Sequence, residues 1–210
     1  MFAMLSEDIK KFLPQYLSAE SANKMFEQLS AFPTDGTKDV VYTSALLNNP
    51  HLFQGDGIAN VEYIDFPDSK VGKLKVILFS NTCDMNMENQ RPNPSRIMYA
   101  PLINFEKYAA GVRKKFPDKA ENHIQAIKSQ HVTQALFLPK GGKLEYDAIV
   151  FFDRAISLPL SQSLVNEMIN NRIFTLSDFG FYLFLFKMSM HFTRIQEKLD
   201  RNAGKDMGTL

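Results

Sequence analysis

A long apolar run near the carboxyl end of the chain places the strongest constraint on its fold. Residues Phe179 to Phe192 read FGFYLFLFKMSMHF, in which Lys187 carries the only formal charge. The run has about 14 residues, whereas a membrane-spanning helix needs about 20, and a helix that is apolar all round is typical of a protein interior. The run therefore predicts the central buried helix of the fold. Because its apolar surface exceeds what one helix has to bury in a chain of this size, self-association through Phe179–Phe192 is an alternative use of it.

Capping signals set the expected limits of this helix. Thr175 and Asp178 have the spacing of a capping box, which predicts a start near Thr175. The charged residues that follow the apolar run predict an end near Arg201, and residues 202–210 are then expected to form a disordered tail. A chain of 210 residues fits a single domain, and residues 1–201 are expected to form it.

Strand patterns are concentrated in two stretches of the chain. Residues 58–66 and 74–79 are rich in β-formers and flank a turn, so they predict a hairpin. Residues 96–100 predict a further strand after a long loop. In the second stretch, residues 132–138 and 146–152 lie on either side of a Gly-Gly turn and predict a second hairpin.

Helical periodicity surrounds and interrupts these strands instead of alternating with them. The expected fold class is therefore α+β, with an antiparallel or mixed β core (58–100 and 132–158) that a barrel-like arrangement would satisfy. The predicted helices before the carboxyl-terminal one cover residues 4–32 (two helices), 104–116, 118–129 and 162–171.

Composition and charge argue against several classes of function. Hydrophobic residues make up 45% and the net charge is +1, so the chain as a whole does not indicate binding to nucleic acid or to a membrane, although a local basic patch leaves nucleic acid open. The cluster Arg113-Lys114-Lys115 is typical of a solvated helix end. A single cysteine excludes an internal disulfide. Together with an N-terminus that lacks a basic signal-peptide segment, it predicts the cytoplasm.

The most distinctive polar segment follows the apolar strand that ends at Phe79. Residues at the carboxyl end of a buried strand often line a crevice, although Asn, Thr and Asp are also common turn residues and a lone Cys is often structural. A long loop continues from this segment and contains two arginines that could contact an anion. The candidate ligand-binding residues are Ser80, Asn81, Thr82, Cys83, Asp84, Arg91 and Arg96.

Two catalytic interpretations of this segment are weaker than a binding one. Cys83 as a nucleophile needs a base, for which His123 and His131 are the candidates. Cys83 and Asp84 as metal ligands lack the closely spaced partner pairs of zinc sites. Phosphate-binding and metalloprotease motifs are absent from the sequence, so no catalytic residue, metal or cofactor is predicted.

Three short segments, Gly55-Asp56, Val76–Ser80 and Tyr99–Leu102, lie within about 50 residues of each other. Together they resemble the small SH3-like barrel of the MazF/PemK toxin ribonucleases. The Arg-Pro pair of that family is replaced here by Gly72-Lys73-Leu74, and the helices after residue 104 have no counterpart in it. The resemblance implies a barrel-like core.

Two functions follow as expectations. The first is a binding or interaction protein whose recognition surface is the polar loop after Phe79. The alternative is an RNA- or nucleotide-directed hydrolase on an SH3-like barrel core, with Arg91 or Arg96 acting together with Asp84 or Ser80.

Overall fold

The described part of the chain mixes helices with antiparallel strands, which confirms the predicted α+β class. The strands form two sheets, and neither closes into a barrel within the described residues. The barrel-like core that the MazF/PemK resemblance implies is therefore not supported. The predicted helices over residues 4–32 and the predicted tail lie outside the described residues. The computed structural model describes residues 41–65, 68–89, 92–93 and 95–193.

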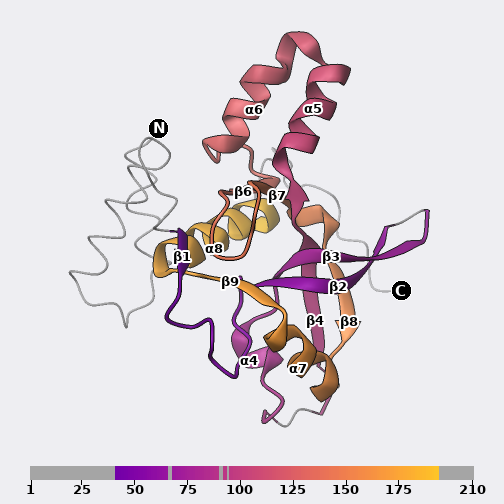
Figure 1. The fold of residues 1–210 in the computed structure, drawn as a ribbon, viewed down its shortest axis with the longest axis vertical. Coiled ribbons are helices and arrows are strands. Elements are labelled where there is room, and N and C mark those ends of the chain that lie inside the picture. Colours follow the sequence, from indigo (N-terminus) through magenta and orange to yellow (C-terminus); the bar gives the residue numbers. More distant parts are fainter. Residues whose placement is uncertain (1–40, 66–67, 90–91, 94, 194–210) are drawn as a thin grey trace, which may run out of the picture.

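The larger sheet has six strands in the order β1-β9-β2-β3-β4-β8, and every neighbouring pair is antiparallel (Figure 1). The predicted first hairpin is the pair β2–β3. Its second strand begins at Lys70, earlier than expected, because Lys70 pairs with Asp65 and Lys73 pairs with Glu62 across the ribbon. The strands are β1 (Tyr42–Thr43), β2 (Gly57–Asp65), β3 (Lys70–Leu78), β4 (Arg96–Pro101), β8 (Ile156–Pro159) and β9 (Arg172–Leu176).

The strand β9 corrects the predicted start of the last helix. Thr175 lies inside β9, all five residues of which are buried. The helix α8 (Asp178–Thr193) begins only after it, and the Ser177 hydroxyl accepts a hydrogen bond from the Gly180 N–H at 3.1 Å. The capping box at Thr175 is therefore wrong, because the segment before the helix is a buried strand between β1 and β2.

The smaller sheet contains the predicted second hairpin. It has the order β5-β7-β6, with β5 (Ile103–Asn104), β6 (Ala135–Leu138) and β7 (Ala148–Phe151). The side chain of Gln130, a residue with a positive φ of 58°, lies against β6. Its amide donates to the Phe137 carbonyl at 2.6 Å and accepts from the Phe137 N–H at 3.2 Å. One side chain thus makes the two hydrogen bonds that a neighbouring strand would make.

Helices α5 and α6 form a hairpin that projects from one end of the molecule (Figure 1). The hairpin consists of the helices α5 (Phe105–Lys115), η1 (Pro117–Lys119) and α6 (Ala120–Lys128). The Asn104 side chain caps α5 by accepting from the Lys107 N–H at 3.0 Å. The base of the hairpin packs on the smaller sheet in a cluster of buried residues: Phe105, Ala109, Ala120, Ile124, Ile127, Ala135 and Ile149.

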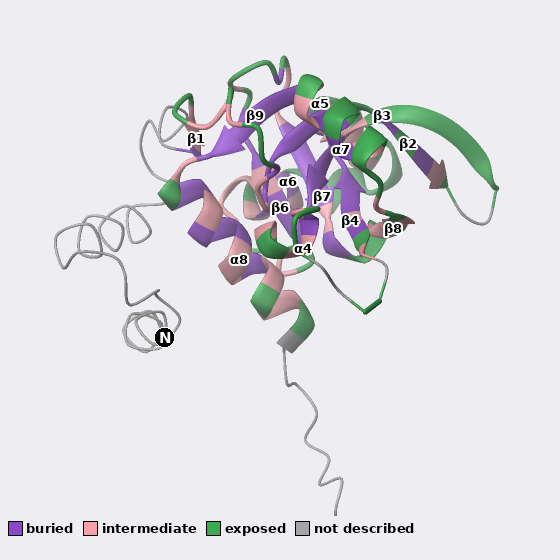
Figure 2. Cartoon of the chain, turned by 90° about the horizontal axis from the view of Figure 1, so that it is seen from below, coloured by how far each residue is buried: buried purple, intermediate pink, exposed green. Residues whose placement is uncertain are grey.

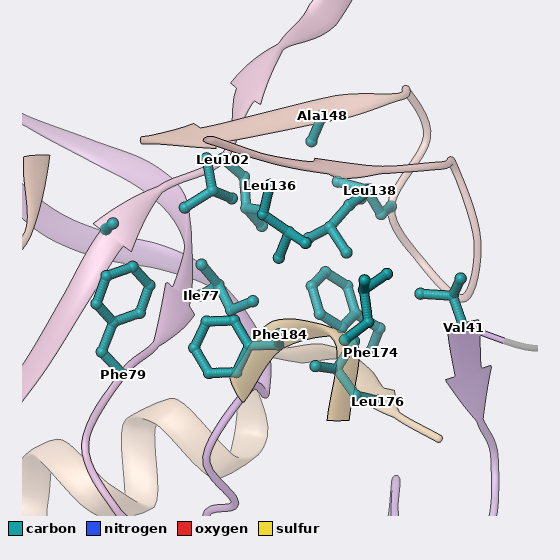
Figure 3. Close-up of a cluster of buried hydrophobic side chains, with 14 of the residues drawn as sticks. Val41, Ile77, Phe79, Leu102, Leu136, Leu138, Ala148, Phe174, Leu176 and Phe184 are labelled. Atoms are coloured by element: carbon teal, nitrogen blue, oxygen red, sulfur yellow. The ribbon is translucent and has the colours of Figure 1, made fainter. Parts of the chain in front are cut away.

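The apolar carboxyl-terminal helix contributes to the largest cluster of buried side chains. Phe184 of α8 meets side chains from both sheets there (Figure 3). The burial of α8 decreases toward its carboxyl end (Figure 2), where Phe192 is 60% exposed. Lys187 is buried, and its Nζ donates to the carbonyls of Gln130 at 2.7 Å and Val132 at 2.6 Å. None of the helices described in the structure is long and apolar enough to cross a membrane.

Candidate functional site

The polar segment begins with a residue that fastens two strands together. The Ser80 hydroxyl accepts a hydrogen bond from the Met98 N–H at 2.7 Å, and Ser80 is only 9% exposed. Ser80 thereby joins the end of β3 to β4, and its contacts in the structure are those of a structural residue.

The next residues turn away from the sheet as a short helix, α4 (Thr82–Met85). The Asn81 side chain caps it by accepting from the Cys83 N–H at 2.9 Å. The Asn89 side chain then donates to the Cys83 carbonyl at 2.8 Å. The long loop predicted between Phe79 and residue 96 therefore includes one helical turn, and Asn89 folds back on that turn.

Beside α4 lies an open hollow of about 540 Å³, called the α4 hollow below. It falls within the range of about 300–1,000 Å³ that ligand pockets occupy. Buried Leu52, Met85 and Val165 contribute apolar side chains, and Thr82 and Gln162 contribute polar ones. The hollow is lined by residues 50–53, by α4 and the loop after it (Thr82, Cys83, Met85, Asn86, Met87, Glu88, Asn89), and by Gln162 and Val165 of α7 (Gln162–Asn170).

Two hydrogen bonds of Gln54 join the two walls of the α4 hollow. The Gln54 N–H donates to the Thr82 hydroxyl at 3.1 Å, and its side-chain amide donates to the Phe79 carbonyl at 2.8 Å. The segment that contains residues 50–53 is thus tied directly to the polar strand end, although the two are about 30 residues apart in the sequence.

A buried arginine organises the segment that leads into this wall. The Arg172 guanidinium donates to the carbonyl oxygens of Leu46 at 2.7 Å and Asn49 at 3.1 Å, and also to the carbonyls of Leu47 and His51. Arginine suits this role because its planar fork carries five N–H donors. One side chain from β9 therefore sets the path of residues 46–51.

The charge of Arg172 is matched by a buried carboxylate. Its Nε lies 3.0 Å from Asp56 Oδ2, and the two side chains are 1% and 0% exposed. The same carboxyl oxygen accepts from the Phe53 N–H at 3.0 Å. Burial raises the pKa of Asp56 to about 6, although Arg172 and the Phe53 N–H both act to lower it. At neutral pH the carboxyl is therefore mainly ionised and pairs with Arg172.

The predicted site residues do not all meet in the α4 hollow. Thr82 and Cys83 line it, and Cys83 is exposed. Arg96 lies elsewhere: its Nε donates to the Ser157 hydroxyl at 3.0 Å and its Nη2 to the Ser157 carbonyl at 2.7 Å. Asn81 and Asp84 belong to the cap and turn of α4 and are not lining residues. Arg91 lies outside the described residues.

Of the two histidines considered as bases for Cys83, His123 lies on α6 and His131 follows the end of that helix. His123 Nε2 is 2.8 Å from the Tyr108 hydroxyl, and His131 Nδ1 is 3.0 Å from the Ser129 hydroxyl. The histidine that lines the α4 hollow with Cys83 is His51. Its only sequence signal was a preceding Pro50 in a turn, which carries no information about residue 83.

Neither a search for metal sites nor a comparison with known proteins assigns a function to this site. Over the described ranges, no group of three or more His, Cys, Asp or Glu side chains is arranged to bind a metal ion. A comparison of the sequence with known protein families and with curated proteins finds no match. The arrangement that the geometry supports is therefore a preformed pocket with an apolar floor and a polar rim.

Proposed function

We propose that this chain is a binding or interaction protein whose recognition surface is the α4 hollow. The observation that supports this most directly is the course of the segment after Phe79. Met85 anchors this segment in the core, and residues on either side of Met85 line an open hollow of about 540 Å³. Pockets with a mainly apolar floor and a few polar groups at the rim are the usual sites for a ligand or for the anchor side chain of a partner.

The lining residues favour an occupant with an apolar group flanked by hydrogen-bonding groups. Leu52, Met85 and Val165 are 3%, 2% and 6% exposed, so an inserted apolar group would meet close-packed side chains. Asn86 and Gln162 at the rim supply amide donors and acceptors. An apolar side chain of an extended peptide has this combination of properties.

The framework of the α4 hollow also supports binding. Arg172 and Gln54 fix the backbone of one wall to β9 and to the end of β3. A wall that is already ordered loses little conformational entropy when a ligand enters, which favours affinity. We expect this binding to take place in the cytoplasm, because a single cysteine fits a reducing compartment.

The single cysteine provides a direct test. A panel of small disulfides, matched in size but with apolar or polar groups, is incubated with the protein under mildly reducing conditions. The Cys83 thiolate displaces a thiol from each disulfide, and intact mass reports the mixed disulfide that forms. Because the chain has one cysteine, every adduct lies on Cys83. We expect apolar fragments to be captured at least several-fold more than polar ones.

A matched control separates the effect of the hollow from a general preference of any protein thiol for apolar fragments. The Cys83→Ser/Lys115→Cys variant carries its only thiol on the exposed end of α5. It should capture apolar and polar fragments equally. The proposed binding function would be overturned if the native protein also captured apolar and polar fragments equally. It would also be overturned if Met87→Asp, at the rim of the hollow, left the preference for apolar fragments unchanged.

The other expectations remain predictions. A hydrolase that uses Arg96 with Asp84 or Ser80 gains no support from the contacts of Arg96, which point to Ser157 of β8. Self-association through Phe179–Phe192 is compatible with the 60% exposure of Phe192. Sedimentation over a range of protein concentrations tests it, since Phe192→Lys should weaken any association that uses this helix.

A further inference from the structure

The outer end of the α5–α6 hairpin is exposed over seven consecutive residues, 113–119. Phe116 lies in the middle of this stretch and is 54% exposed, an unusual position for a large aromatic side chain. The Lys115 Nζ lies 5.5 Å from the centre of the Phe116 ring. The end of the hairpin thus combines an accessible aromatic face with neighbouring positive charge.

Positive charge is concentrated on this hairpin relative to the rest of the chain. The whole chain has a net charge of +1, whereas residues 105–128 contain six basic and three acidic residues. Arg113 is paired with Glu121 at 2.7 Å, and Lys114, Lys115 and Lys119 are exposed around Phe116. The six basic residues are Lys107, Arg113, Lys114, Lys115, Lys119 and Lys128.

Aromatic and basic side chains continue to the base of the hairpin. The Tyr108 hydroxyl contacts His123 Nε2 at 2.8 Å, and the Tyr108 ring lies 5.5 Å from the Phe151 ring. The Arg154 guanidinium lies 5.1 Å from the centre of the Phe151 ring. Tyr108, His123 and Phe151 are partly exposed and Arg154 is exposed. Seven residues of helix separate Tyr108 from Lys115, a rise of about 10 Å.

We propose that this surface binds single-stranded nucleic acid. Phe116 at the outer end and Tyr108 near the base would stack on unpaired bases, while Lys114, Lys115 and Arg154 would contact phosphates. Stacking of bases on aromatic rings tolerates any sequence, because every base has a π-face. The interaction is separate from the α4 hollow, since none of these residues lines it.

The distribution of apolar groups favours nucleic acid over a membrane surface. An element that inserts into a bilayer presents a continuous apolar face, whereas Phe116 is the one large apolar side chain that is strongly exposed among the described residues of this hairpin. Tyr108 and Phe151, the other two aromatic rings of this surface, are partly buried and lie at the base of the hairpin. The ring of Tyr108 is in addition bonded to His123 through its hydroxyl, which fixes its orientation.

Fluorescence anisotropy with labelled ten-nucleotide oligo-U RNA and oligo-dT DNA tests the proposal on the full chain. At about 50 mM salt, Lys114→Glu/Lys115→Glu should weaken binding at least tenfold, and it should lower the slope of log K against log salt by about one to two. Phe116→Ala should weaken binding about tenfold even at about 200 mM salt, because stacking does not depend on counterion release.

The Lys70→Glu/Lys73→Glu variant is the matched control, since it makes the same change of charge on the exposed part of β3. It should bind as the native protein does.

The proposal is wrong if neither oligonucleotide binds at about 50 mM salt or if the control loses as much affinity as the hairpin variant. It is also wrong if vesicles containing anionic lipid bind and the oligonucleotides do not. Preference for RNA or for DNA would show whether the sugar contributes. Disulfide capture by the native protein reports on Cys83, and none of the residues changed in the hairpin variants lines the α4 hollow, so failure of either proposal leaves the other standing.

Discussion

The α4 hollow and the α5–α6 hairpin are both positioned by a buried cation that donates to backbone carbonyls, but the two cations differ in their partners. Arg172 contacts four carbonyls beside the hollow and has a carboxylate partner in Asp56. Lys187 contacts two carbonyls at residues 130 and 132, where the chain leaves the hairpin. Burial lowers the pKa of Lys187 to about 8. Burial also lowers the pKa of Arg172 and raises that of Asp56, but there each charge partly offsets the effect of burial on the other.

This difference in partners indicates how strongly a mutation at each surface should affect the stability of the fold. The wall of the hollow depends on an ion pair deep in the large sheet, so its shape and the stability of the fold are coupled. The outer end of the hairpin is exposed and lies beyond its small core, so its chemistry can change with little effect on stability. Four predictions test this contrast.

The largest effect is expected for Arg172→Ala. Removal of one partner of a buried ion pair leaves an uncompensated charge and costs about 3–5 kcal/mol, and four carbonyls lose a donor. Urea denaturation should show this loss, and thiol labelling of Cys83 should change as the wall of the hollow relaxes. The Asp56→Leu/Arg172→Met double variant should lose less stability than the sum of the losses of Asp56→Leu and of Arg172→Met measured singly. Additive losses would contradict the coupling.

Titration of Asp56 should make the stability of the fold depend on pH. Its pKa is raised from 3.8 to about 6, so the folded state binds more protons than the unfolded state between these values. The free energy of unfolding should therefore decrease as pH rises from about 4 to about 6, by about 1.4 kcal/mol for each unit of pKa difference. Asp56→Asn should remove this slope in denaturation curves measured across that range. A slope that persists in the variant would assign it to another group.

Lys187→Met should have a smaller effect and the opposite pH dependence. The folded pKa of about 8 lies below the ordinary value of 10.5, so the unfolded state binds more protons in this window. The native protein should become more stable as pH rises from about 8 to about 10.5. The variant should lose that dependence and about 1–3 kcal/mol at neutral pH, because two partly buried carbonyls lose their donor. Amide exchange should increase first at residues 130–132.

Phe116→Ala should have the smallest effect on stability, within about 0.5 kcal/mol. The ring is 54% exposed and lies outside the buried cluster at the base of the hairpin. Thermal denaturation measures this, and Phe105→Ala at the first residue of α5 provides the contrast, because Phe105 is fully buried. An equal loss for both variants would show that the outer end of the hairpin is not independent of its core.

Local patterns in the sequence predicted most elements of the fold but not the contacts that build the site. Both hairpins and the helices α5, α6 and α7 follow from periodicity and turn chemistry. The strand β9 was missed because Thr175 and Asp178 have the spacing of a helix cap, while burial on both faces of a sheet leaves no period to detect. The role of Arg172 was missed because its partners are carbonyl groups more than 120 residues away, which no spacing reveals.

The Gln130 side chain has a consequence for how copies of this chain behave toward each other. An uncovered edge strand presents N–H and C=O groups on which a second chain can add a strand. At β6 these groups of Phe137 are already occupied by the amide of Gln130. A strand added here from a second molecule would have to displace both hydrogen bonds of Gln130, so we expect this single amide side chain to oppose aggregation through that edge.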